Sequence, residues 1–196
     1  MDLTEGTIEQ KNTRAKKMML WFGIASLIMS FGGLTSAFIV SSTREDWLLD
    51  FQLPHSFFYS TAIILLSSVV LFFAEKTLKQ NKYSLTLALL IGTFLLGLAF
   101  IFTQFSGFTE LIVSGYNFTG PTSNITMSYI YIIAVVHLLH VAVGLICLSV
   151  TIVNHLKKSY SPSKMLGLEL ASTFWHFIDV LWLYLFLFLY FFNRIN

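Results

Sequence analysis

The sequence predicts an all-α polytopic membrane protein, a bundle of five transmembrane helices. Of its 196 residues 56% are hydrophobic and 11% are charged, a balance that soluble globular chains do not show. The apolar residues are collected in five stretches, each near the ~20 residues that a helix needs to cross a bilayer. The Lys and Arg residues fall between these stretches, mainly in alternate connections.

We expect the first predicted span to be a transmembrane helix of the protein rather than a cleaved signal peptide. It is too long for a signal peptide, it carries Trp21 and the pair Gly32 and Gly33, and no clear small-residue cleavage site closes it. The third and fifth spans hold hardly a charge apart from Asp179, and the fourth is long enough to tilt. The five spans are predicted at 18–40, 56–74, 84–103, 127–153 and 171–192.

The segment 104–126 is predicted to be a loop between the third and fourth spans. It contains Gly107, Gly115, Gly120 and Pro121, and it lacks Lys and Arg. The absence of basic residues places it on the outer side of the membrane.

The basic residues predict the orientation. Ten lie in the N-terminal segment and in the second and fourth connections, and the other side has only Arg44 and Arg194. The positive-inside rule then places the N-terminus in the cytoplasm and the C-terminus outside. We expect a cytoplasmic tail at 1–17, one five-helix domain at 18–196, and residence in a bacterial inner (plasma) membrane. The ten are Lys11, Arg14, Lys16, Lys17, Lys76, Lys79, Lys82, Lys157, Lys158 and Lys164.

The composition argues against nucleic-acid binding and against sites built from cysteines. The basic residues are divided among short loops rather than pooled, so we expect no nucleic-acid partner. Cys147 is the only cysteine, which excludes an intrachain disulfide and a thiolate metal cluster.

Small residues recur at helical spacing in the first span, at Ser26, Ser30, Gly33 and Ala37. Such rows let helix backbones approach closely, which predicts that this span packs against another helix. Glycine is also simply frequent in membrane helices, so both interpretations stay open.

His137 and His140 share one face of the fourth span because they are three residues apart. Such a pair can hold a metal or line a proton path, but a metal site needs three or four ligands. Two histidines on one turn also cannot be the opposed axial ligands of one haem. We therefore favour helix-to-helix hydrogen bonds for this pair.

The fifth span carries Glu169, His176 and Asp179 on roughly one stripe. A carboxylate near the middle of a bilayer costs about 2.5 to 3.5 kcal/mol even on the insertion scale, so the stripe must face protein or water. A proton relay or substrate path is one interpretation. We favour a buried network in which Asp179 accepts a hydrogen bond from a neighbouring helix. Trp175 and Trp182 lie on one face by their spacing, and simple packing explains them.

Two motifs in the last two spans carry a family resemblance. The run 174–183, FWHFIDVLWL, is preceded by Gly167 and Glu169. It resembles the closing helix of cytochrome c oxidase subunit III, with that family's W-H-F-x-D-x-x-W pattern. The run 137–144, HLLHVAVG, resembles the family's H-x-x-H-x-x-x-G helix, and the spacing between the two motifs agrees. The resemblance extends over the five spans, which are similar to the last five helices of the seven-helix long form.

The chain lacks two acidic residues that the family carries at the corresponding positions. The family's first shared helix carries a glutamate after a serine, where this chain has Phe31 after Ser30. The family's Q-x-S-E pattern at the outer end of the third span reads here as Gln104 to Gly107. A carbodiimide-reactive carboxylate, or a proton-antenna role built on it, therefore does not carry over.

The resemblance implies an accessory subunit of a haem-copper terminal oxidase, a complex that reduces oxygen to water and pumps protons. It implies no redox centre in this chain, with haem and copper in partner subunits and bound phospholipid at the interface. The implied partners are catalytic subunit I directly, subunit II, other respiratory subunits and membrane lipid. The electron donor is cytochrome c or a quinol. We expect buried polar packing, with support for lipid binding or proton uptake, from His137, His140, Glu169, Trp175, His176, Asp179 and Trp182.

Two rival classes are weaker. A small proton-coupled transporter is expected to show interrupted spans in a repeat, and no comparable pair is visible. A di-haem cytochrome needs histidines opposed across helices, and His55 and His155 lie near span ends.

Overall fold

The computed structural model describes residues 7–48, 53–120, 123–161 and 165–195, with side chains up to residue 192 in the last range. Within these ranges the chain forms helices and no strand. Each helix is long and apolar enough to cross a membrane, which confirms the predicted all-α bundle of five spans. The helices are α1 (Ile8–Ser41), α2 (His55–Lys79), α3 (Tyr83–Val113), α4 (Ile125–Leu156) and α5 (Leu166–Ile195).

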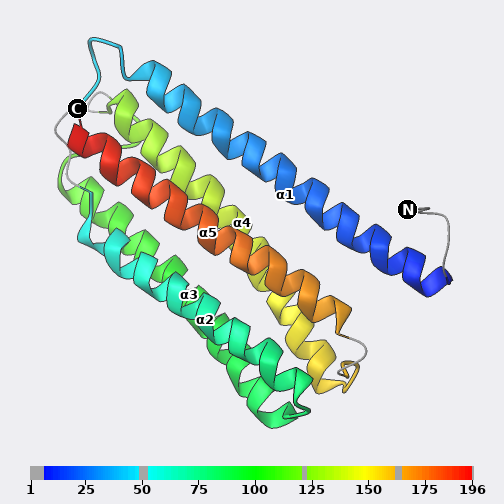
Figure 1. Cartoon of the computed structure of the whole chain (residues 1–196). Coiled ribbons are helices and arrows are strands. Elements are labelled where there is room, and N and C mark those ends of the chain that lie inside the picture. The colour runs from blue at the N-terminus through cyan, green and yellow to red at the C-terminus, as the bar shows by residue number, and fades with distance from the viewer. Residues whose placement is uncertain (1–6, 49–52, 121–122, 162–164, 196) are drawn as a thin grey trace.

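The helices run up and down, and α1 stands apart from the rest (Figure 1). The helices α2 and α3 form a tight hairpin, with Asn81 at a φ of 58° in the turn between them. Helix α5 contacts α1, α2 and α4, and among the described helices α1 contacts only α4 and α5. Toward its N-terminus α1 diverges from the other helices.

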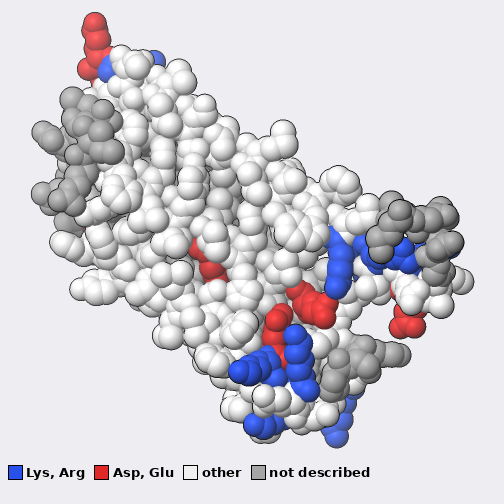
Figure 2. Space-filling view, in the orientation of Figure 1, with Lys and Arg blue, Asp and Glu red and all other residues white. Residues whose placement is uncertain are grey.

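The basic residues gather at one end of the bundle, where α1, α3 and α5 begin and α2 and α4 end (Figure 2). We call this the basic end. At the opposite end Arg44 pairs with Asp46, with Nε to Oδ1 at 2.8 Å.

The predicted loop at 104–126 was too long. Helix α3 continues to Val113 and α4 begins at Ile125. Gly107 does not break α3 because it serves close packing: a Cβ at this position would come within 2.6 Å of Cε1 of Phe57 on α2. Pro121 lies outside the described residues.

Helix α1 begins at Ile8, inside the segment predicted as a tail. A capping box starts it. The amide of Gln10 donates to Oγ1 of Thr7 at 3.3 Å, and the amide of Thr7 donates to Oε1 of Gln10 at 3.1 Å. These bonds satisfy backbone donors that the first turn of a helix leaves free.

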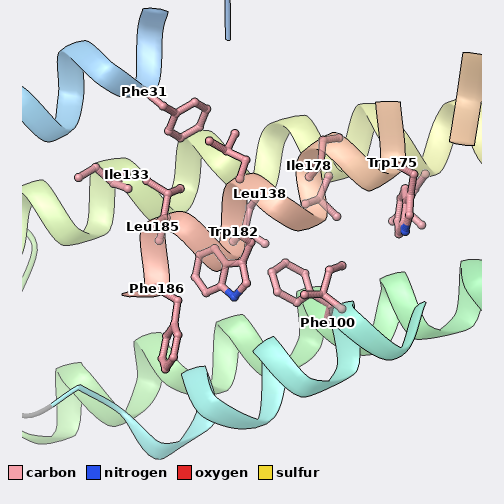
Figure 3. Close-up of a cluster of buried hydrophobic side chains, with 14 of the residues drawn as sticks. Phe31, Phe100, Ile133, Leu138, Trp175, Ile178, Trp182, Leu185 and Phe186 are labelled. Carbon is pink, nitrogen blue, oxygen red and sulfur yellow. The ribbon is translucent and has the colours of Figure 1, made fainter. Parts of the chain in front are cut away.

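The core is built around two tryptophans of α5 (Figure 3). Trp175 lies against Gly97 of α3 and Gly144 of α4, where added Cβ atoms would come within 2.7 and 2.9 Å of its ring. Trp182 meets Phe100 of α3 edge to face, with ring centroids 5.3 Å apart. The two glycines thus leave the space that the ring of Trp175 fills.

The small residues of α1 do not make its contacts within the chain. A Cβ at Gly32 or Gly33 would meet no atom within 4 Å, and Ser26 and Ser30 are exposed. The first span does pack against other helices, α4 and α5, but in the described part of the chain it does so through a different face than this row. The buried face of α1 consists of Ile24, Phe31, Thr35 and Phe38.

Candidate functional site

The two tryptophans of α5 are anchored to α2 by hydrogen bonds. Trp175 Nε1 donates to Oγ of Ser67 at 2.8 Å, and Trp182 Nε1 donates to Oγ1 of Thr61 at 3.0 Å. Both rings are 1% exposed. An indole N–H in an apolar interior needs a partner, and a hydroxyl on the facing helix provides it. The packing role predicted for Trp175 and Trp182 therefore agrees with their position, with two hydrogen bonds in addition.

His137 of α4 lies in a box of aromatic rings. Its ring centroid is 5.0 Å from that of Trp182, 6.0 Å from Phe100 and 6.3 Å from Phe31. The side chain is fully buried, and neither ring nitrogen has a hydrogen-bond partner among the described residues.

His140 is half-buried on the neighbouring side of α4. Its Nδ1 donates to the carbonyl oxygen of Val136 on its own helix at 2.7 Å. The ring also packs against Phe31, with centroids 5.8 Å apart. The predicted helix-to-helix hydrogen bonds of His137 and His140 are therefore absent from the described structure, because aromatic rings occupy the positions that polar partners would need.

His176 and Asp179 lie where α5 faces α2. The Nδ1 of His176 is hydrogen-bonded to Oγ of Ser68 at 2.6 Å. Asp179 is 1% exposed, yet neither of its carboxyl oxygens has a hydrogen-bond partner in the described residues. Ser68 of α2, which is bonded to His176, is also placed beside the Asp179 carboxyl group. The predicted hydrogen bond to Asp179 from a neighbouring helix therefore stays a prediction, with Ser68 as its candidate donor.

Glu169 does not belong to this buried group. It lies at the basic end, is partly exposed, and pairs with Lys17 of α1, with Oε2 and Nζ 2.9 Å apart. The predicted polar stripe of α5 therefore divides into a surface ion pair at Glu169, the half-buried His176 and the buried Asp179, because the helix entry is already at the surface.

A second buried polar network, which sequence reasoning missed, joins α2 and α3. The Nε2 of Gln104 donates to Oγ of Ser60 at 2.8 Å, and both residues are fully buried. One turn outward, Ser56 donates to Oε1 of Glu110 at 2.5 Å. The available signal was the recurrence of hydroxyls along α2, at Ser56, Ser60, Thr61, Ser67 and Ser68.

The described residues contain no group of three or more His, Cys, Asp or Glu side chains close enough to share a metal ion. The polar groups instead tie helix to helix: α2 to α5 through two indoles and one imidazole, and α2 to α3 through Gln104. Chemically, this arrangement can fix the relative positions of helices.

A groove separates α1 from the rest of the bundle at the basic end. It has a volume of about 1110 Å³, and its lining includes Lys16, Lys17 and Lys79. A second, more apolar hollow of about 450 Å³ lies between α1, α4 and α5. Both hollows are lined by Tyr160 and Gly167, so they meet at the start of α5.

Comparison with known proteins agrees with this architecture. A family model described as cytochrome c oxidase subunit III matches residues 3–194. Cytochrome c oxidase subunit 3 of Drosophila melanogaster is 34% identical over 203 residues, covering 95% of this chain and 74% of that protein. Cytochrome bo(3) ubiquinol oxidase subunit 3 of Buchnera aphidicola is 29% identical, covering 95% of this chain and 92% of that protein.

A further relative, cytochrome c oxidase subunit 3 of Aedes aegypti, is 33% identical over 140 residues. That match covers 71% of this chain, and the chain spans about half the length of the mosquito protein, 50%. With a family model matched along nearly its whole length and its five spans in place, the chain belongs to the cytochrome c oxidase subunit III family.

Proposed function

We propose that this chain is the non-catalytic third subunit of a respiratory haem-copper oxidase, packing on and stabilising the catalytic subunit. The observation that carries the proposal is the family match along residues 3–194. In such a complex oxygen is reduced to water and protons are pumped, while this chain contributes structure.

The chain holds no haem or copper in this proposal, and the metals belong to partner subunits. The arrangement of its histidines supports this. His137 is enclosed by aromatic rings, and His140 and His176 are each tied to α4 or α2. Elemental analysis of the purified chain is the measurement, and one tightly bound iron or copper per chain would contradict the proposal.

The basic end faces the cytoplasm of a bacterial cell in this proposal, which places the N-terminus inside. The clustering of Lys and Arg at one end of the bundle supports it (Figure 2). Reporter fusions after Lys79 and after Lys157 are expected to report cytoplasm. A fusion near Gly115 that reported cytoplasm would contradict this orientation.

The groove at the basic end is the proposed site of a bound anionic phospholipid. Lys16, Lys17 and Lys79 line the groove together with Glu9 and Glu169, and because Glu169 pairs with Lys17 the lysines still outnumber the remaining acid. Leu20, Ile146 and Phe174 line the adjoining apolar hollow. The phosphate group of a lipid fits the groove lined by lysines, and its acyl chain fits the apolar hollow. Replacing Lys16 and Lys79 together with Gln should reduce the phospholipid that co-purifies, measured by mass spectrometry of the extracted complex.

Cytochrome c and a quinol are the two proposed electron donors, and relatives with names of both kinds match the chain over most of its length. The decisive experiment is affinity purification through a tag on this chain from native membranes. We expect a haem-bearing catalytic subunit to co-purify and to consume oxygen with one donor. If no such subunit is recovered under mild detergent, the proposed function fails.

A further inference from the structure

Helix α1 is fastened to the bundle mainly through the half that leads away from the basic end. Three of its four buried residues lie at or beyond Phe31. In the same half, Thr35 Oγ1 lies 3.2 Å from the hydroxyl oxygen of Tyr184 on α5. Ser41 Oγ lies 2.9 Å from the hydroxyl oxygen of Tyr129 on α4. Hydrogen bonds and close packing therefore hold this half in place.

The other half of α1 is less well supported. We call residues 8–30 the arm and residues 31–41 the anchored segment. The arm stands away from the other helices toward its N-terminus (Figure 1), and the groove at the basic end lies between it and the bundle. Lys17 of the arm and Glu169 of α5 pair across this groove, and their side chains are 50% and 39% exposed. An exposed ion pair is weak in water, so this tie opens and closes readily.

A glycine pair stands where the arm meets the anchored segment. A Cβ added at Gly32 or Gly33 would meet no atom within 4 Å, so side-chain packing does not account for either glycine within the described chain. Hydroxyl groups on both sides of the pair bond to the helix backbone. Ser30 Oγ donates to the carbonyl oxygen of Ser26 at 2.9 Å, and Thr35 Oγ1 donates to that of Gly32 at 3.2 Å. Glycine weakens a helix and such hydroxyl bonds bend it, so this boundary has the properties of a hinge.

We propose that α1 bends at Gly32 and Gly33, so that the arm moves over the groove as a lid and the ion pair of Lys17 with Glu169 is its latch. An anionic phospholipid opens the latch, because its phosphate group competes with the Glu169 carboxylate for the Lys17 ammonium group. This inference rests on the proposed lipid site and deepens it by assigning what controls entry to the groove.

The size of the movement follows from the length of the arm. Ala15 lies about 26 Å along the helix from Gly32. A bend of about 10° at Gly32 therefore displaces Ala15 by about 4 Å. Pairs of spin labels resolve a change in distance of this size.

The first experiment measures distances between spin labels on the full-length chain in phosphatidylcholine nanodiscs, with Cys147→Ser to remove the free cysteine. The arm pair is Ala15→Cys with Leu156→Cys at the end of α4. The reference pair is Val40→Cys with Val113→Cys, both exposed, which joins the anchored segment to α3. We expect two distances about 4 Å apart for the arm pair and one for the reference pair. A single distance for the arm pair would overturn the hinge.

Alanine substitutions test the glycine pair. The double variant Gly32→Ala, Gly33→Ala should stiffen the hinge without a clash, and Gly23→Ala is the matched control. At all three positions an added Cβ would meet no atom within 4 Å. We expect the double variant to lose the longer distance of the arm pair and Gly23→Ala to keep it, with circular dichroism checking that both fold. Equal distance distributions in the two variants would overturn the hinge.

The latch is tested by Glu169→Gln in the same labelled chain. The ratio of open to closed arms should rise about twofold to fivefold, the change that the loss of an exposed ion pair produces. Phosphatidylglycerol added to the nanodiscs should open the arm of the wild-type chain and have no further effect on Glu169→Gln. An unchanged ratio in Glu169→Gln would overturn the latch.

The source of the phosphate group is tested with inorganic phosphate in phosphatidylcholine nanodiscs at the same ionic strength. We expect no opening. Opening equal to that caused by phosphatidylglycerol would overturn the assignment to a lipid. The outcomes also separate this inference from the proposed function. A chain that brings down the catalytic subunit but shows a single arm distance refutes the hinged arm alone, whereas a chain that brings down no catalytic subunit refutes the proposed function.

Discussion

Helices α1 and α4 are both apolar enough to span a membrane, yet the chain buries them very differently. In the most apolar 18-residue stretch of α4, 50% of the residues are buried inside the bundle. In the corresponding stretch of α1 the share is 22%. The difference lies in what each helix offers its neighbours. Gly144 of α4 receives the ring of Trp175, while Gly32 and Gly33 of α1 receive nothing from the described residues. Hydropathy thus decides that both helices enter the membrane, and shape complementarity decides which one joins the core.

The largest effect that tests this comparison is expected at the glycines. Gly144→Val would push its side chain into Trp175, whose Cε3 lies within 2.9 Å of an added Cβ. We expect destabilisation of about 1 to 3 kcal/mol, and loss of folded protein if the ring cannot move. Gly32→Val, the matched change in α1, should leave thermal unfolding in detergent unchanged. Equal destabilisation by the two changes would mean that α1 packs as closely as α4.

A middle-sized effect is expected at the tryptophans. Trp182→Phe removes the hydrogen bond to Thr61 and leaves a small void beside Phe100, which should cost about 1 to 2 kcal/mol. Trp21→Phe in α1 is the control, since that ring is 62% exposed. Its expected cost is near zero. The comparison can be read from the midpoint of thermal unfolding in detergent, and a larger loss from Trp21→Phe would reverse the assignment of core and periphery.

The smallest effect is expected at the ion pair that ties α1 to α5. Both Lys17 and Glu169 are partly exposed, so Glu169→Gln should cost less than about 1 kcal/mol and the loss should shrink further at high salt. The midpoint of thermal unfolding at low and at high salt is the measurement, with Glu9→Gln on the exposed first turn of α1 as control. A loss of several kcal/mol would show that this pair, rather than the aromatic contacts of Phe31 and Phe38, holds α1 in place.

How much of the structure could be predicted from the sequence depends on how far apart in the chain the interacting residues lie. The spans could be predicted from runs of apolar residues, but the extension of α3 to Val113 could not. In the sequence Gly107 suggests the end of a helix, and only the structure shows that it packs against Phe57. The pairing of the Trp175 indole with Ser67 also depends on a residue more than a hundred positions away in the chain. No local pattern carries that information.

The sequence by itself determined the five membrane spans, the basic end and the family motifs, because the cost of burying charge in lipid and the spacing of side chains on a helix are local properties. Only the tertiary structure decided which faces meet. It enclosed His137 in aromatic rings, left Asp179 without a partner in the described residues, and moved Glu169 to the surface. Each of these outcomes depends on which neighbour a side chain finds after the helices pack. That choice is made by shape and by the few polar partners available, such as Ser68 of α2 beside His176.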